Sequence, residues 1–169
     1  VTFQSATTLT GGIVINTGNG AGTVAFNSTL DSAASAANTL EITAGTGNID
    51  FDAAVGSAVG GELGAITINS VATLLADSTV EAASFTQGAG SVVTQFDGTV
   101  TLSDLFDFTG TALTFNAASN TIGGTMDVTN SGVFTTADVA DIEVTGQLTQ
   151  DGTSTSSIGA DITATAGMD

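Results

Sequence analysis

The chain has 169 residues and a mass of 16.4 kDa, enough for one domain with a sizeable core. It carries 17 acidic residues and no Lys, Arg or His, so its net charge is −17, and it contains neither Cys nor Pro. No side chain could neutralise phosphate, so we do not expect nucleic acid as a partner. Without Cys the chain forms no disulfide. No run of about 18 apolar residues is present to span a bilayer, so we do not expect membrane insertion.

The first predicted element is a strand at Val1–Phe3, in which an apolar residue, an outward residue and a Phe precede a polar residue. The same phrase returns later at Gly22–Asn27, Gly47–Asp52, Thr94–Asp97 and Ala112–Asn116. Alternation with a period of two indicates a strand with one buried face, and the Asn, Asp or Gln after the Phe favours a turn. Each phrase therefore predicts a short strand that runs into a corner.

Other segments alternate in the same way and are also predicted as strands. In chain order they are Ile13–Ile15, Leu40–Ile42, Leu63–Val71, Val100–Leu102, Phe106–Phe108, Met126–Val128, Ile142–Val144 and Ile162–Ala164. Residues 31–38 are rich in Ser and Ala and fit either one helical turn or a tight loop. Residues 71–87 approach helical spacing but also alternate, and we favour strands there because both neighbouring segments are strands. The Gly-rich stretches 17–22 and 44–47 are predicted as turns.

The spacing of the Phe residues predicts the fold. Phe3, Phe26 and Phe51 recur at nearly equal intervals, Phe96 follows Phe51 after twice that interval, and Phe115 follows Phe96 after a slightly shorter one. Such a period is typical of solenoids, in which one coil must stack on the next to bury its apolar face. We therefore predict an all-β chain folded as a parallel β-helix with roughly 20–25 residues per coil and a ladder of Phe inside. The alternative is a β-sandwich.

The two ends of the sequence suggest a unit of something longer. Gly167–Asp169, when joined to Val1–Gln4, reads as a turn followed by a strand, and neither end resembles a polar capping coil. We expect residues 1–169 to form a single solenoid unit, one repeat of a longer array or filament. Its neighbours are either covalent repeats or identical subunits stacked end to end.

Several stretches together resemble the β-strand repeats of filamentous-haemagglutinin-like bacterial surface proteins. They are Leu40–Gly56, Leu63–Ser70, Ala83–Gln87, Leu113–Asn116 and Gly146–Thr153. The resemblance covers nearly the whole chain and implies a right-handed parallel β-helix, export from the cell, and a role in adhesion or in extracellular fibres. The chain departs from the family in one respect, because such repeats usually carry a few basic residues.

The residues available for chemistry are carboxylates and hydroxyls, since His, Cys, Lys, Arg and Tyr are absent. The pairs Asp50/Asp52 and Asp104/Asp107 are close in sequence, but Asp50 and Asp52 alternate with apolar residues and are predicted to face solvent. We therefore predict no catalytic residues, no enzyme activity and no cofactor.

The remaining candidate site is for Ca²⁺, because a short acidic run clusters three hard oxygen ligands at Asp138, Asp141 and Glu143. Neither the EF-hand nor the calcium-roll pattern is present. Ca²⁺ is therefore expected mainly as a diffuse counterion.

These patterns predict a structural subunit of an extracellular fibre or cell-surface filament whose partner is itself. The absence of Lys and Arg removes every cleavage site for trypsin-type proteases, which suits an exposed fibre. An adhesin stalk that binds glycans or surfaces is the alternative. A carbohydrate-active enzyme is the third possibility, and it would show converging carboxylates with perturbed pKa values in a groove.

Overall fold

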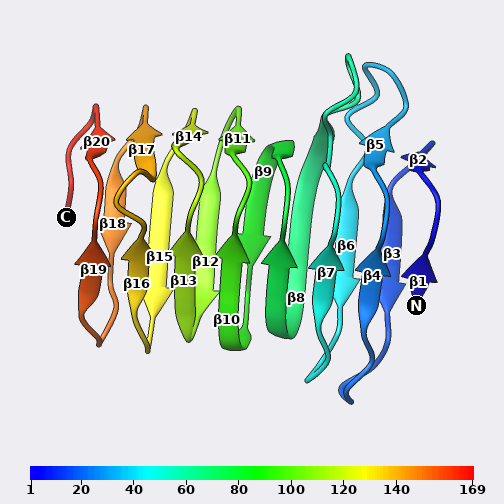
Figure 1. Ribbon diagram of the computed structural model, residues 1–169, viewed down its shortest axis with the longest axis horizontal. Coiled ribbons are helices and arrows are strands. Elements are labelled where there is room, and N and C mark those ends of the chain that lie inside the picture. The colour runs from blue at the N-terminus through cyan, green and yellow to red at the C-terminus, as the bar shows by residue number, and fades with distance from the viewer.

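The computed structural model describes residues 1–169, which form strands, turns and loops but no helix. The chain winds through about eight coils. These follow one another along the long axis, so the termini lie at opposite ends (Figure 1). Every ladder between named strands is parallel. The predicted parallel β-helix is confirmed, and the sandwich alternative is wrong because its strands pair antiparallel.

Each complete coil contributes a strand to three stacks. The first stack contains β1 (Thr2–Phe3), β4 (Val24–Phe26), β7 (Ile49–Phe51), the second half of β8 (Leu63–Ala76), β10 (Gly90–Phe96), β13 (Ala112–Phe115), β16 (Phe134–Thr136) and β19 (Ser156–Ile158). The second contains β2 (Thr7–Leu9), β5 (Leu30–Ser32), the first half of β9 (Val80–Gln87), β11 (Val100–Leu102), β14 (Ser119–Ile122), β17 (Asp141–Val144) and β20 (Ile162–Ala164), with Val55 bridging β5 and β9.

The third stack closes each coil. It contains β3 (Ile13–Asn16), β6 (Leu40–Thr43), the first half of β8, the second half of β9, β12 (Phe106–Gly110), β15 (Met126–Asn130) and β18 (Leu148–Gln150). Met168 bridges to Leu148 and so continues this stack at the C-terminal end.

The coils near the N-terminus are longer than the others. The inward position of the first stack passes in order through Phe3, Phe26, Phe51, Ala76, Phe96, Phe115, Thr136 and Ile158. The number of residues between successive members of this column is larger for each interval as far as Ala76 than for every interval after it. The extra residues of the long coils form loops that project beyond the body, next to β5 and before β8 (Figure 1). The predicted coil length therefore holds, with variation carried by loops.

Residues 31–38 and 71–87, whose sequences fit either a helical or a non-helical conformation, are both non-helical. Residues 71–87 lie in β8 and β9, as favoured, and β8 is longer than predicted because it continues around a corner. Within β8, Ile66 pairs with Leu40 in the third stack and Leu74 pairs with Ile49 in the first. Of residues 31–38, Asp31 and Ser32 belong to β5 and the others form a loop and not a helical turn.

The predicted Phe ladder lies inside the solenoid. Ring centroids are 4.5 Å apart for Phe3 and Phe26, 5.6 Å for Phe26 and Phe51, and 5.2 Å for Phe96 and Phe115. All three pairs are stacked, because parallel strands in register place the same position of successive coils one above the other. The long interval from Phe51 to Phe96 is two coils, and Ala76 occupies the ladder position between them.

A second column of aromatic rings meets the first where the ladder is interrupted. Phe85 and Phe106 stack in the third stack of strands at 5.2 Å. Phe106 also lies 6.1 Å from Phe96 and 5.6 Å from Phe115, so four rings form one cluster in the middle of the molecule. Eight of the nine Phe side chains are buried, and only Phe3, in the first coil, is partly exposed.

The polar side chains inside the solenoid are all paired with hydrogen-bond partners. Six polar residues are buried, namely Ser32, Gln87, Thr94, Asn120, Asn130 and Thr136. Gln87 accepts a hydrogen bond from the Thr94 hydroxyl at 2.7 Å, which links the third stack to the first across a corner. The structure contains no helix long and apolar enough to cross a membrane.

Candidate functional site

The three predicted Ca²⁺ ligands lie near β17. Asp138 is in the turn after β16, whereas Asp141 and Glu143 project outward from β17, and all three are exposed. Asp141 and Glu143 line a shallow hollow of 380 Å³ together with Asp161, whose backbone N–H donates to the Asp141 carboxylate at 3.1 Å. Asp138 does not line this hollow. Nowhere in residues 1–169 do three or more acidic side chains form an arrangement suited to a metal ion.

Asp161 was not among the predicted ligands, because it lies a full coil after Asp141 in the sequence. The signal that finds it is the coil period, since Ile142 pairs with Ile162 and so places Asp161 beside Asp141. Position in the coil, and not distance in sequence, decides which carboxylates meet in a solenoid.

We expect divalent cations to act on this surface as diffuse counterions. At equal concentrations, Ca²⁺ and Mg²⁺ should raise the thermal unfolding midpoint by similar amounts, because screening depends on charge and not on ligand geometry. Thermal melts monitored by circular dichroism with each chloride salt measure this. A midpoint that rises with Ca²⁺ but not Mg²⁺, and that loses this rise in the triple variant Asp141→Asn, Glu143→Gln and Asp161→Asn, would instead establish a specific Ca²⁺ site.

Carboxylates also follow one another at the corner after the first stack. Asp52 and Asp77 occupy the same corner of adjacent coils, since their N–H groups donate to the carbonyls of Phe26 and Phe51. Asp50 lies beside them on β7. Burial raises the pKa of Asp50 above its ordinary value, and the carboxylates of Asp52 and Asp77 raise it further. The outward orientation predicted for Asp50 is correct, but its carboxyl is only partly solvated.

A second carboxylate row lies in the third stack. Asp107 on β12 pairs in register with Asp127 on β15. Burial raises the pKa of Asp107, and the adjacent Asp127 carboxylate adds to that rise. Asp104, the sequence neighbour predicted to accompany Asp107, lies in the corner before β12 and is exposed. The neighbouring carboxylates are therefore those of Asp107 and Asp127 in adjacent coils, and not those of Asp104 and Asp107 within one coil.

These two rows make the stability of the chain depend on pH. A carboxyl whose pKa is higher in the folded than in the unfolded chain opposes folding while it is ionised. Lowering the pH through the raised pKa values of Asp50 and Asp107 removes this opposition, so the chain is less stable at neutral pH than at mildly acidic pH. We expect the urea midpoint to increase as the pH is lowered from neutral towards the ordinary carboxyl pKa of 3.8.

The variant Asp107→Asn tests the cause of this pH dependence. It should raise the midpoint at neutral pH and reduce the gain on acidification. The matched variant Asp151→Asn removes one charge from an exposed position and should change both quantities less. A midpoint that falls as the pH is lowered would contradict the prediction.

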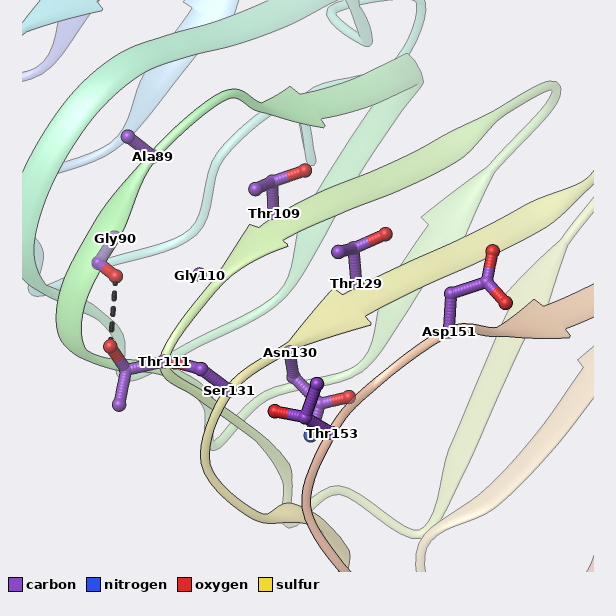
Figure 2. A pocket seen from close by; sticks show the side chains of 10 residues that line it. All are labelled: Ala89, Gly90, Thr109, Gly110, Thr111, Thr129, Asn130, Ser131, Asp151 and Thr153. Carbon is purple, nitrogen blue, oxygen red and sulfur yellow. Dashed lines mark hydrogen bonds between the residues drawn. The ribbon is translucent and has the colours of Figure 1, made fainter.

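A polar trough follows the corner between the third and first stacks. It has a volume of 340 Å³, and the polar residues that line it are Thr109, Thr111, Thr129, Asn130, Ser131, Asp151 and Thr153. Figure 2 shows Thr109 and Thr129 side by side on adjacent strands, and the Thr111 hydroxyl donating to the Gly90 carbonyl, at 3.1 Å. Hydroxyl, amide and carboxylate groups of this kind are suited to hydrogen bonding with a polyhydroxylated ligand.

The trough was not predicted from the sequence, although a signal for it is present. One short polar phrase occurs three times, as Thr109-Gly110-Thr111, Thr129-Asn130-Ser131 and Asp151-Gly152-Thr153. Its interval matches the coil period, so the phrase places hydroxyl-bearing residues at one corner of successive coils.

Apolar side chains line a hollow at each end of the solenoid. At the N-terminal end, Phe3, Leu9, Ile13 and Ile15 line a hollow of 170 Å³, which we call the N-terminal hollow. At the C-terminal end, Phe134, Leu148, Ile158, Ile162 and Met168 line a hollow of 300 Å³, the C-terminal hollow. Both are apolar because the core continues to the first and last coils.

The strands beside these hollows have one free edge each. β1, β2 and β3 pair only with β4, β5 and β6, and β19 and β20 pair only with β16 and β17. An unpaired strand edge is a template for another strand. The ends are therefore the surfaces of this molecule best suited to an interaction.

Comparison with known proteins does not assign this chain to a family, so its function is inferred from its architecture. No protein-family model, curated protein or solved structure matches this chain. The part of the haemagglutinin-like resemblance that the structure supports is a β-solenoid of about eight coils built from repeating units.

Proposed function

We propose that this chain is a structural unit of an extracellular fibre or cell-surface filament, in which β-solenoid coils continue from one unit to the next. The observation that carries the proposal is the pair of solenoid ends, where the apolar core and the strand edges are both open. A coil that stacks on either end buries apolar surface and pairs backbone groups at the same time.

The interior of the solenoid suits a stiff fibre. Inward columns of Phe, Val, Ile and Leu side chains form one continuous core, so each coil packs on the next. The absence of Lys and Arg also leaves no site for trypsin-type proteases. Both properties favour persistence outside the cell.

Immunogold electron microscopy of the cells that make the protein tests this function. An antibody raised against residues 1–169 should label fibres or the outer surface, and preimmune serum is the control. Labelling confined to the cell interior would overturn the proposal. Immunoblotting of the native material under denaturing conditions then separates two arrangements, because a band near 16.4 kDa indicates separate subunits and a much larger band indicates a tandem array.

An adhesin stalk that binds glycans is the second candidate, and the polar trough is the observation that favours it. Its hydroxyl rows repeat with the coils and so suit an extended polyhydroxylated chain. Calorimetric titration with soluble polysaccharides should show binding that the double variant Thr109→Val and Thr129→Val loses. The variant Thr114→Val with Thr135→Val, on a different stack, is the matched control.

A further inference from the structure

We infer that the last coil of one copy docks in register on the first coil of a second copy, so that β19 pairs with β1, β20 with β2, and the segment ending at Met168 with β3. This inference rests on the proposed function and names the partner, a second copy of the same chain, together with the register of contact. The two surfaces in contact differ and lie at opposite ends of one long axis, so the association continues along that axis and produces an open filament.

The free edges of the two ends are compatible with this pairing. β1 pairs with β4 on one side only, and β19 pairs with β16 on one side only, in the same first stack. β2 and β20 stand in the same relation in the second stack. A second copy therefore continues all the ladders as parallel pairs, the arrangement found throughout the body.

The inward side chains of the two ends also correspond. In the proposed register Ile158 lies against Phe3, and these residues are the last and first members of one inward column. Met168 lies against Ile13 in the third stack, where the two side chains are 64 % and 39 % exposed. In the same column Leu40 and Phe106 are fully buried, so docking gives the end residues the environment of the interior.

The distribution of charge disfavours contact between two C-terminal ends. Residues 1–30 contain no acidic side chain, and the first carboxylate of the chain is Asp31. The last coil carries Asp151, Asp161 and Asp169. Docking of the C-terminal end on the N-terminal end brings these carboxylates against a coil without side-chain charge, whereas contact between two C-terminal ends brings carboxylates together.

The spacing of the chain distinguishes separate copies from directly joined ones. If Asp169 were joined directly to Val1 of a second copy, the chain from Ile158 to the second Phe3 would form one step of the inward column. That step would be shorter than the shortest one in the body, which runs from Phe96 to Phe115. A direct join of Asp169 to Val1 therefore cannot keep this register. The proposed register therefore requires separate copies, or copies joined through a spacer.

Disulfide trapping tests the register, because the chain has no cysteine of its own. The outward residues Thr2 and Ser157 become neighbours in the proposed contact, as do Thr8 and Thr163 in the second stack. Adjacent strands bring such positions within the range for a disulfide. We expect the double variants T2C/S157C and T8C/T163C to give a series of cross-linked multimers under mild oxidation, seen on non-reducing denaturing gels.

Swapped pairs are the matched controls. T2C/T163C and T8C/S157C carry the same cysteines at the same exposed positions but place them on different stacks, so each should give about tenfold less cross-linking. Circular dichroism of all four variants checks that they are folded. The single variants T2C and S157C report contact between like ends.

The outcomes separate this inference from the proposed function. Equal cross-linking of matched and swapped pairs, or preferential dimers of either single variant, would overturn the register. Monomers for every pair at all protein concentrations would overturn docking of separate copies. Immunogold labelling of fibres in that case would leave the proposed function standing, whereas interior labelling would remove the function whatever the purified chain does.

Discussion

Replacing Phe106 by Ala should lower the free energy of unfolding by about 3–5 kcal/mol, the usual cost of deleting a fully buried aromatic side chain. The Phe106 ring is completely buried and lies between 5.2 and 6.1 Å from the rings of Phe85, Phe96 and Phe115. Its loss opens a cavity where the two aromatic columns meet. Because each coil contacts only its neighbours, the surrounding coils have few ways to close that cavity.

Equilibrium unfolding in urea, followed by circular dichroism, measures this loss. The matched variant is Phe3→Ala, since Phe3 lies in the first coil and stacks on Phe26 alone. It should cost less than half as much, because part of the ring is already in water. A loss below about 1 kcal/mol for Phe106→Ala would contradict the cluster as a major source of stability.

Replacing Asn120 by Ala should lower the free energy of unfolding by roughly 3 kcal/mol, through loss of hydrogen bonds and not of apolar contacts. Asn120 is buried at the start of β14. Its Oδ1 accepts from the Val100 N–H at 3.1 Å, and its Nδ2 donates to the carbonyls of Ala117 and Asp141 at 3.2 Å each. One side chain thus connects three consecutive coils, and its removal leaves buried backbone groups without these partners.

Two measurements check this role. Urea unfolding gives the stability, and hydrogen exchange should show faster exchange of the Val100 amide in the Asn120→Ala variant. The matched variant is Asn116→Ala, whose more exposed side chain donates to the Asp97 carboxylate at 2.6 Å and should cost less than about 0.5 kcal/mol. Unchanged exchange at Val100 would contradict the proposed connection.

Repetition explains why so much of this fold was predictable. The phrase around Phe26 and Phe51 returns at the coil period, and a period-two pattern indicates its own buried face. The ambiguous residues 71–87 follow the same logic, because a chain that places strands on both sides of them continues its ladders through them. Local pattern and global fold agree in most coils, so each repeat reinforces the assignment of the next.

The features that were missed depend on which coils lie side by side. Distance in sequence pairs Asp107 with Asp104, but the register pairs it with Asp127. Asp161 and the residues of the polar trough were overlooked for the same reason. Coil length varies along the first stack, since the step from Phe26 to Phe51 is longer than the step from Phe96 to Phe115. Residues separated by one coil therefore cannot be matched until the loops are placed.

The sequence by itself determined the all-β solenoid, the inward Phe column and the strong negative charge, because each follows from local alternation or composition. Only the tertiary structure decided the meeting of Phe106 with the ladder, the partners of Asn120, the carboxylate rows and the correspondence of the two ends. Those features are contacts between residues one or more coils apart, and their register is set by loop lengths and corners that no local pattern specifies.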